Sequence, residues 1–257
     1  MKETNKMAKK QKQSTRKLLM VGPNAPFQFN EAYKSLRTNL EFLSATSSYK
    51  VILVTSSMPE EGKSNVAINL AQTLAANGKR VILVDGDLRK GTMGRYLHIP
   101  RNHPGLTNKF TGQAEWNDAL IHYNKSNMLV SPTGPLPPNP SEMLSSKRMK
   151  AMFEELRGYA DYIIIDTPPV PVVTDAAVMS GFSDGVILVV RPGVTLIQSA
   201  QLTKKNLEAV GATILGVVVN GFDVKKSAHK DGYYYSYSYN DYYNNEDENQ
   251  PPKEKKA

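Results

Sequence analysis

The chain contains no cysteine among its 257 residues, so disulfides, cysteine-ligated metals and thiol nucleophiles are excluded. Its four histidines, at positions 98, 103, 122 and 229, show no paired metal-ligand spacing. No apolar run reaches the roughly 18 to 20 residues that cross a bilayer, and the start of the chain lacks the apolar segment of a secretory signal. These absences favour a cytoplasmic protein.

Acidic side chains are scarce at the start of the chain. Residues 1–20 carry seven basic side chains against one acidic, a charge of +6 out of the total of +8. Residues 223–257 carry six basic against seven acidic side chains, which leaves only +3 for the middle of the chain. This distribution argues against a nucleic-acid partner. We expect a basic arm over residues 1–22 that contacts anionic lipid or protein, or is simply solvated.

Short β-branched runs alternate with helical stretches along the chain. Nearly continuous apolar strands of this kind are buried on both faces of a parallel sheet. The pattern predicts a doubly wound α/β domain with a mainly parallel sheet over residues 23–222. Expected strands are 51–55, 81–85, 128–130, 162–166, 185–190 and 213–219, and expected helices are 64–77, 141–157, 195–210 and one after a cap at Asn30.

A phosphate-binding loop follows the first expected strand, where Gly62, Lys63 and Ser64 open a helix. Backbone N–H groups at a helix start can cradle the phosphates of ATP. Lys63 would neutralise their charge, and the Ser64 hydroxyl would ligate Mg²⁺. The predicted nucleotide site also takes in Ser57, Glu61 and Asn65. Two features are unusual: Ser57 replaces the first glycine of a P-loop, and Glu60 adds a carboxylate that must point away from the phosphates.

Two further strands end in acidic residues. Asp166 follows an apolar strand as in a Walker B motif, in which the carboxylate holds magnesium. Asp85 and Asp87 end another strand, and two acidic strands are more than ordinary nucleotide binding needs. We expect Asp85 to act as a general base and Asp87 to support the metal. The alternative is that these residues cap helices or form turns.

The end of the chain is rich in tyrosine. Its neighbours are Ser, Asn, Asp and Glu, so this segment cannot bury enough apolar surface to fold alone. The phenols would then be accessible as phosphate acceptors, although tracts of this composition also occur as disordered or aggregation-prone segments. The seven candidate acceptors are Tyr233, Tyr234, Tyr235, Tyr237, Tyr239, Tyr242 and Tyr243.

Together these motifs resemble the bacterial tyrosine kinases (BY-kinases) that control capsular and exopolysaccharide synthesis. The resemblance covers residues 30–243 and rests on five segments: SSMPEEGKSN as Walker A, VILVDGDLR as an extra A′ motif, YIIIDTPPV as Walker B, GPLPPNPSEML as a connector, and the tyrosine cluster. It is strongest toward the stand-alone cytoplasmic kinases of Gram-positive bacteria. It implies a P-loop NTPase fold with deviant Walker motifs, ATP and Mg²⁺ as cofactors, and tail phosphorylation in trans.

The resemblance also implies partners. These are a membrane protein that activates the kinase at the inner face of the plasma membrane, a cognate tyrosine phosphatase and further copies of the chain in a ring. The family's Glu-x-x-Arg-x-x-Arg stripe, which packs the ring, is matched over a helix at 31–45 by Glu31, Lys34 and Arg37, with lysine replacing an arginine. Gly91 stands where the A′ motif usually continues with proline.

Two positions stay open between a site role and a local role. In related ATPases an asparagine after the last core strand faces the adenine, and Asn220 matches that place. A turn-forming Asn-Gly pair is the other interpretation. Asp175 either lies near the metal or caps the next helix, and we favour the cap.

The main rival function is a ParA/MinD-like ATPase that switches with nucleotide and phosphorylates nothing. Such proteins usually carry a second lysine early in the phosphate loop, near position 58, where this chain has Met58. Members that bind membranes end in a basic amphipathic helix, whereas this chain ends in PPKEKKA. A third interpretation is an adaptor whose tail only binds partners. That interpretation requires an inert phosphate site, although every residue needed for catalysis is present.

Overall fold

The computed structural model describes residues 18–124 and 126–222. Contacts divide the chain after Asn220, and every described helix and strand lies in the first unit, Met1–Asn220. The description below is of this unit. Most of the predicted basic arm and the seven tail tyrosines lie outside the described residues. No described helix is long and apolar enough to cross a membrane.

A seven-stranded sheet forms the centre of the unit, with strand order β3-β4-β2-β5-β1-β6-β7. All its strands are parallel except β3, which pairs antiparallel with β4 at one edge. The predicted α/β class with a mainly parallel sheet is therefore confirmed. The strands are β1 Val51–Ser56, β2 Val81–Asp85, β3 Ile121–His122, β4 Met128–Ser131, β5 Tyr162–Asp166, β6 Gly185–Val190 and β7 Ile214–Val219.

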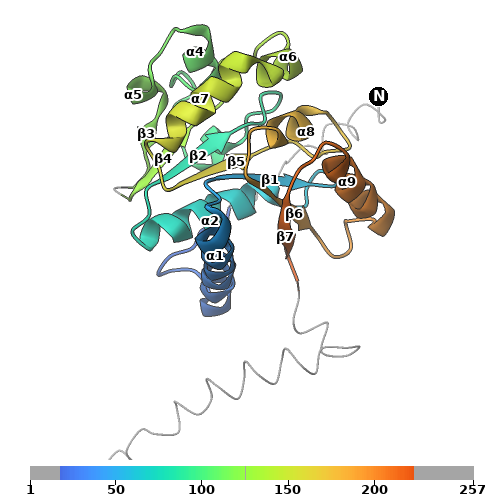
Figure 1. The fold of residues 1–257 in the computed structure, drawn as a ribbon. Coiled ribbons are helices and arrows are strands. Elements are labelled where there is room, and N and C mark those ends of the chain that lie inside the picture. The colour runs from blue at the N-terminus through green and yellow to red at the C-terminus, as the bar shows by residue number, and fades with distance from the viewer. Residues whose placement is uncertain (1–17, 125, 223–257) are drawn as a thin grey trace, which may run out of the picture. The chain divides into compact units, whose positions relative to one another are not determined.

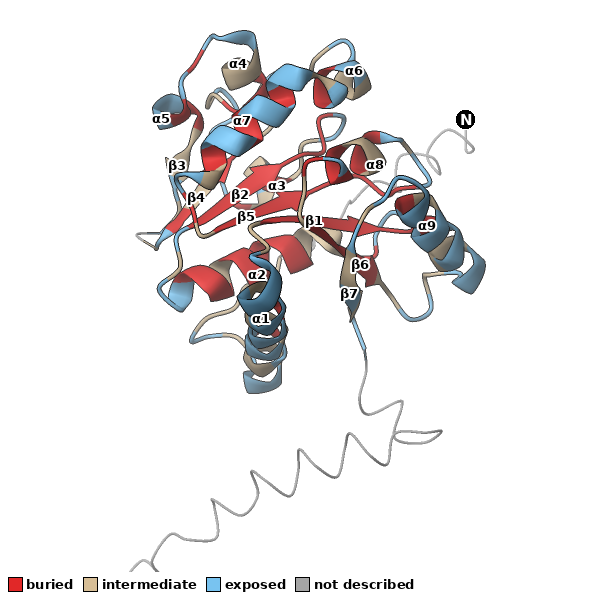
Figure 2. Cartoon of the chain, viewed as in Figure 1, coloured by how far each residue is buried: buried red, intermediate tan, exposed pale blue. Residues whose placement is uncertain are grey.

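Helices cover both faces of the sheet, with α1 and α2 on one face and α6, α7, α8 and α9 on the other (Figure 1). The central strands β1, β2 and β5 are buried along their whole length, as Figure 2 shows. The helices are α1 Phe27–Ser47, α2 Lys63–Ala76, α3 Met93–Tyr96, α4 Leu106–Thr111, α5 Trp116–Ala119, α6 Pro140–Ser145, α7 Lys147–Arg157, α8 Asp175–Ser180 and α9 Ile197–Ala209.

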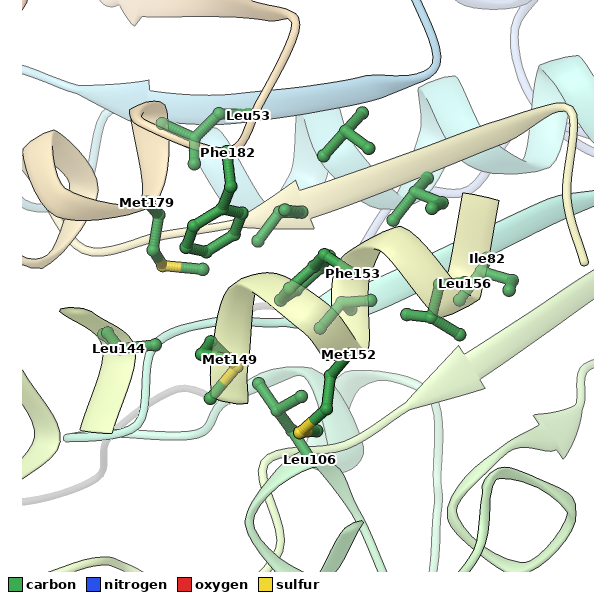
Figure 3. Packing of buried hydrophobic residues seen from close by; sticks show 14 of the residues in the cluster. Leu53, Ile82, Leu106, Leu144, Met149, Met152, Phe153, Leu156, Met179 and Phe182 are labelled. Carbon is green, nitrogen blue, oxygen red and sulfur yellow. The ribbon is translucent and has the colours of Figure 1, made fainter. Parts of the chain in front are cut away.

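The core has one hydrophobic cluster on each face of the sheet. On the α7 face, the ring of Phe153 stacks on that of Phe182 with centroids 4.8 Å apart, next to Met179 and Leu53 (Figure 3). On the other face, most residues of α2 are buried, and its apolar side chains belong to the same hydrophobic cluster as those of the strands. This double packing holds β1, β2 and β5 in place, and the chain segments that follow them carry the candidate site.

Three local predictions were wrong. The helix expected over residues 141–157 is two helices, because the extended backbone of Ser146 (φ −71°, ψ 148°) interrupts it and its side chain caps α7. Asn30 does not begin a helix: α1 starts at Phe27, and the Asn30 side chain bonds both backbone polar groups of Gly22. The last strand is not buried on both faces, since it lies at the sheet edge and Val217 is 57% exposed.

Candidate active site

The order of the strands brings the motif segments together. β5 lies between β2 and β1, and the register pairs Asp166 with Asp85 on one side and with Val54 on the other. Because all three strands are parallel, their carboxyl ends meet at one edge, which is where sites form in such sheets. The predicted Walker B acid, the A′ acids and the phosphate loop therefore share one edge of the sheet.

The phosphate loop connects β1 to α2 and ends at Gly62, whose φ of +89° suits glycine far better than other residues. The next residue, Lys63, places Nζ 3.4 Å from Asp166 Oδ1 and 3.3 Å from Ser64 Oγ. Burial disfavours the charged ammonium, but the three neighbouring aspartates outweigh this effect and raise the pKa of Lys63. Lys63 therefore carries a fixed positive charge at the start of the helix.

A buried carboxylate shapes the same loop from inside. Glu61 is fully buried, and its Oε2 accepts the backbone N–H groups of Ser57 (2.7 Å) and Met58 (2.9 Å). Its other oxygen accepts the hydroxyl of Thr195, which lies 134 residues further along the chain. Both oxygens of the Glu61 side chain are thus engaged within the protein and are not free to face a nucleotide. Nothing in the sequence signals the contact with Thr195.

Glu60, the unusual carboxylate of the loop, is an exposed residue. Its backbone lies at φ +66°, and its carbonyl oxygen accepts a hydrogen bond from Arg191 Nη1 at 3.1 Å. The neighbouring Ser57 is buried, with an Oγ that has no hydrogen-bond partner among the described residues. A serine therefore fits at the position where a P-loop usually has glycine.

Asp85 is a buried acid of the site with a strongly raised pKa. Burial raises its pKa to about 8, and the nearby carboxylates of Asp166 and Asp87 act in the same direction. The N–H of Met93 donates to Asp85 Oδ2 at 3.0 Å and opposes this shift. The pKa of Asp166 is also raised, first by burial. A carboxyl group with a pKa near neutrality suits proton transfer.

The acids of the site fit a magnesium ion that is shared with a nucleotide. Asp166 Oδ2 is buried and has no hydrogen-bond partner among the described residues. No three His, Cys, Asp or Glu side chains in residues 18–124 and 126–222 are grouped so as to hold a metal by themselves. Magnesium usually takes one or two carboxylates, waters and substrate phosphates. Asp166 and the Ser64 hydroxyl match that mode, with Asp87 two residues beyond Asp85.

The A′ segment is anchored by an arginine that the sequence interpretation missed. Arg89 Nε lies 2.8 Å from Asp175 Oδ2, and its Nη2 bonds both Asp175 Oδ1 and the hydroxyl of Ser141. Asp175 is fully buried and makes no cap contact at the start of α8. The favoured prediction that Asp175 caps this helix was therefore wrong. Instead, the residue connects the A′ segment to α6 and α8.

The backbone after the A′ acids explains the departure at Gly91. Its φ of +46° lies outside the range that a proline ring permits, near −65°. A side chain there would also meet the Thr133 hydroxyl at 2.7 Å. The segment thus takes a path that excludes proline and favours glycine where the family's motif has proline.

The remaining predicted residues lie at the margins of the site. Asn220 Nδ2 donates to the carbonyl of Glu61 at 2.8 Å, so this side chain lies against the phosphate loop. The side chain of Asn65 instead accepts from the Tyr33 hydroxyl of α1 at 3.0 Å and also bonds the carbonyl of Leu19. Its side chain is therefore occupied by the α1 side of the molecule.

Among the described residues, the ion pairs of the charged stripe on α1 lie within the helix. Lys34 pairs with Glu31 at 2.6 Å, and Arg37 Nε lies 3.7 Å from Glu41. Lys34 is exposed, whereas Glu31 and Arg37 are half-buried. The stripe is present on the surface of this helix, and its role in assembly stays a prediction.

Comparison with known proteins places these features in one family. The AAA domain family matches residues 49–213. The tyrosine-protein kinase YwqD of Bacillus subtilis (strain 168) is 38% identical over 80% of this chain and 86% of its own length. The putative tyrosine-protein kinase CapB of Staphylococcus aureus is 33% identical over 90% of this chain and 99% of its own length.

Solved structures agree with this placement. The chimerical protein CapA2B2 superposes with a TM-score of 0.73 at 35% identity, covering 78% of this chain and 87% of its own. The septum site-determining protein MinD of Pyrococcus horikoshii, at 24% identity and a TM-score of 0.57, shares the fold alone. The chain therefore belongs to the bacterial tyrosine-protein kinases of the capsular polysaccharide type.

Proposed function

We propose that this chain transfers the γ-phosphate of ATP to tyrosines in the tail of a second copy. The observation that carries the proposal is that two buried acids, Asp85 and Asp166, end neighbouring strands beside Lys63. Phosphate binding alone would use Lys63 and Asp166. A second acid with a pKa of about 8 adds a group suited to take a phenol proton.

The reaction is a direct transfer. The phenol oxygen bonds to the γ-phosphorus while the bond from that phosphorus to the ADP oxygen breaks, and the phenol proton passes to Asp85, which accepts it in its ionised form. Lys63 and the backbone N–H groups at the start of α2 hold the phosphates and offset their charge. Magnesium, when bound, would neutralise charge between the phosphates. Asp166, Ser64 and Asp87 are the side chains that would hold it.

The test is intact-mass and peptide mass spectrometry after incubation of the full chain with Mg²⁺ and ATP. Phosphate within residues 233–243 of the wild type, absent from Lys63→Ala and retained in the exposed-surface control Lys205→Ala, is the expected result. Turnover of ATP with no modified tyrosine would instead favour the MinD-like nucleotide switch, whose fold this chain shares.

A mixing experiment tests transfer between copies. One variant keeps the active site and has all seven tail tyrosines replaced by phenylalanine, while the other is Lys63→Ala with its tail intact. Phosphate on the Lys63→Ala tail demonstrates transfer in trans. Wild-type chains that modify their own tails while this mixture stays unmodified would show transfer within one chain.

The regulatory context belongs to the same proposal. A membrane-embedded activator would bring the kinase to the inner face of the plasma membrane, and a tyrosine phosphatase would reset it. Each phosphate adds roughly −1.5 to −2 charges, so several on one tail would repel neighbouring subunits and open a ring, coupling the cycle to polymer export. Adding the activator's cytoplasmic part to the mass-spectrometric assay should raise the rate of tail modification. An unchanged rate would argue against activation by that partner.

A further inference from the structure

A cavity of about 770 Å³ lies beside the A′ segment. It is bounded by residues 88–91, by α3 with the turn that follows it, and by residues 132–136 after β4. Its volume is within the range of about 300 to 1,000 Å³ that small-ligand sites occupy. The transfer chemistry described above does not use it.

The lining of the cavity is basic. It includes Arg89, Lys90, Arg95 and Arg101 together with His98 and His103, and it includes no aspartate or glutamate. Arg89 is held by Asp175, and Arg95 lies over the ring of Tyr96 at 5.5 Å. Lys90, Arg95 and Arg101 form no salt bridge within residues 18–124 and 126–222. Their uncompensated charge favours an anionic ligand.

The same cavity has an apolar wall. Leu88, Ile99 and Leu136 line it alongside two prolines, and Leu136 is 69% exposed. A free phosphate or a phosphoserine would use the cations and leave this wall in water. A phosphotyrosine has both an anionic group and an aromatic ring, and a guanidinium can bind the phosphate through two parallel hydrogen bonds. The lining therefore fits an aryl phosphate best.

The cavity adjoins the transfer site through one short loop. Asp87 Oδ1 accepts the N–H groups of Lys90 (3.1 Å) and Arg89 (3.3 Å), so the loop that carries the acids also presents these cations to the cavity. In the tail sequence the acceptors are closely spaced, and Tyr237 and Tyr239 are two residues apart. This separation is about 7 Å in an extended chain.

We propose that this basic cavity binds a phosphotyrosine in the tail of a second copy and thereby presents the next tyrosine for transfer. The inference rests on the proposed function and adds a product-binding site to it. Modification of one tail would then proceed through several tyrosines in one encounter. The acidic residues that follow the cluster, Glu246 to Glu248, add charge that complements the cavity.

A binding experiment without ATP tests the site apart from the kinase reaction. Fluorescence anisotropy would compare a peptide of residues 231–248 phosphorylated at Tyr239 with its unphosphorylated twin, both added to the full-length Lys63→Ala chain. We expect at least tenfold tighter binding of the phosphopeptide, and displacement by phenyl phosphate at lower concentration than by inorganic phosphate. Equal binding of the two peptides would overturn the proposal, as would equal displacement by the two competitors.

Matched variants locate the site. Arg95→Gln with Arg101→Gln removes two charges from the cavity, and Lys147→Gln with Lys205→Gln removes two from exposed positions on α7 and α9. Most of the preference for the phosphopeptide should disappear in the first pair and persist in the second. An equal loss in both pairs would show general charge attraction and overturn the assignment. Circular dichroism melts establish that both double variants are folded. The competition between phenyl phosphate and inorganic phosphate uses neither double variant, so it tests the proposal even if one of them unfolds.

The number of phosphates per chain gives the functional readout at partial turnover. The wild type should show multiply modified chains beside unmodified ones. The Arg95→Gln/Arg101→Gln variant should have a similar initial rate, with its phosphates distributed at random among the chains. A random distribution in the wild type would overturn the successive mechanism. If the kinase reaction itself fails while the phosphopeptide still binds, the proposed function is wrong and the cavity assignment survives. If the kinase is active but the phosphopeptide does not bind, the proposed function survives and the cavity assignment is wrong.

Discussion

At the scale of single residues, the site is dominated by the burial of charge. Asp85, Asp166 and Lys63 lie at adjoining strand and loop ends in a region from which water is largely excluded. A carboxylate there loses hydration that the lysine only partly replaces, so the pKa of Asp85 rises to about 8. The same burial that would suit this group to the proposed proton transfer makes it a source of instability without nucleotide.

Because the ionised form of Asp85 destabilises the folded chain, we predict that the neutral variant Asp85→Asn is more stable at high pH. In the folded chain Asp85 holds its proton up to about pH 8, whereas in the unfolded chain it loses the proton near pH 3.9. Between these values the folded state binds the extra proton, so the free energy of unfolding falls as pH rises. We expect Asp85→Asn to raise the melting temperature without nucleotide by more than about 2 °C at pH 8, and by less at pH 5.

The same variant should lose about 10²- to 10⁴-fold in tyrosine phosphorylation, because an amide cannot accept the phenol proton. Thermal melts at the two pH values and phosphotyrosine mass spectrometry check the two effects together. Asp118→Asn, on the exposed surface of α5, is the control and should change neither. A variant with unchanged stability at both pH values would show that the pKa of Asp85 is not raised.

At the scale of elements, the phosphate loop depends on a contact between two distant segments. Glu61 Oε2 binds two loop N–H groups, while Thr195, just before α9, donates its hydroxyl to Oε1. The loop is therefore held from within, and the segment between β6 and α9 contributes to its shape through Thr195. This arrangement leaves the start of α2 to face the phosphates.

We predict that Glu61→Ala destabilises the chain by about 2 kcal/mol, because it leaves the buried N–H of Ser57 and the partly buried N–H of Met58 without an acceptor. Glu61→Gln, which keeps one oxygen, should lie between Ala and the wild type. Urea unfolding measures both variants, and nucleotide binding should weaken in the same order. Exposed Glu60→Ala is the neighbouring control. Equal stability of Glu61→Ala and wild type would contradict a structural role for this carboxylate.

The break between α6 and α7 supplies a second test at this scale. Ser146 Oγ accepts the N–H of Met149 at 3.1 Å and so caps α7, which carries Phe153 into the core. Ser146→Ala should lower the free energy of unfolding by about 1 kcal/mol. Ser145→Ala, one residue earlier and not a cap of α7, should have a smaller effect in the same urea titration. Equal effects would mean that the cap contributes nothing.

At the scale of the whole molecule, we predict that assembly depends on the surface of α1. Its stripe of Glu31, Lys34 and Arg37 is satisfied mainly by contacts within the helix, which are worth only about 0.2–0.5 kcal/mol each. Such weak pairs exchange readily for contacts with another copy. The Nε atom of Arg37 is buried without a hydrogen bond to any described residue, although Glu41 lies nearby.

We predict that Arg37→Glu shifts the chain toward the monomer, because it places a like charge four residues before Glu41 and removes the cation from the stripe. Light scattering coupled to size exclusion should show the lower mass at the concentration where the wild type associates. Tail phosphorylation should fall together with association if transfer occurs between copies. Arg148→Glu, an equal reversal on exposed α7, is the control. A variant that associates as the wild type does would remove α1 from the interface.

The local sequence pattern was sufficient to predict most strands of the sheet. Strand bounds at 81–85, 162–166 and 185–190 were predicted without error, because apolar runs flanked by turn residues are a local signal. Two predictions failed because a side chain bonds a partner outside its own helix: Asn30 bonds Gly22, eight residues earlier, and Asp175 bonds Arg89, 86 residues earlier, and neither caps a helix. Short elements such as β3 and α3 lack enough residues to show a period.

Composition and motif order alone establish an α/β chain with a phosphate loop, two acidic strand ends and a tyrosine-rich tail, because each is written within a few consecutive residues. Tertiary structure decides which of these groups act together. Sheet order brings Asp85 beside Asp166, burial raises the pKa of Asp85, and the contact of Glu61 with Thr195 joins residues 134 positions apart. Proximity and desolvation depend on how the whole chain packs, so neither can be read from a local segment.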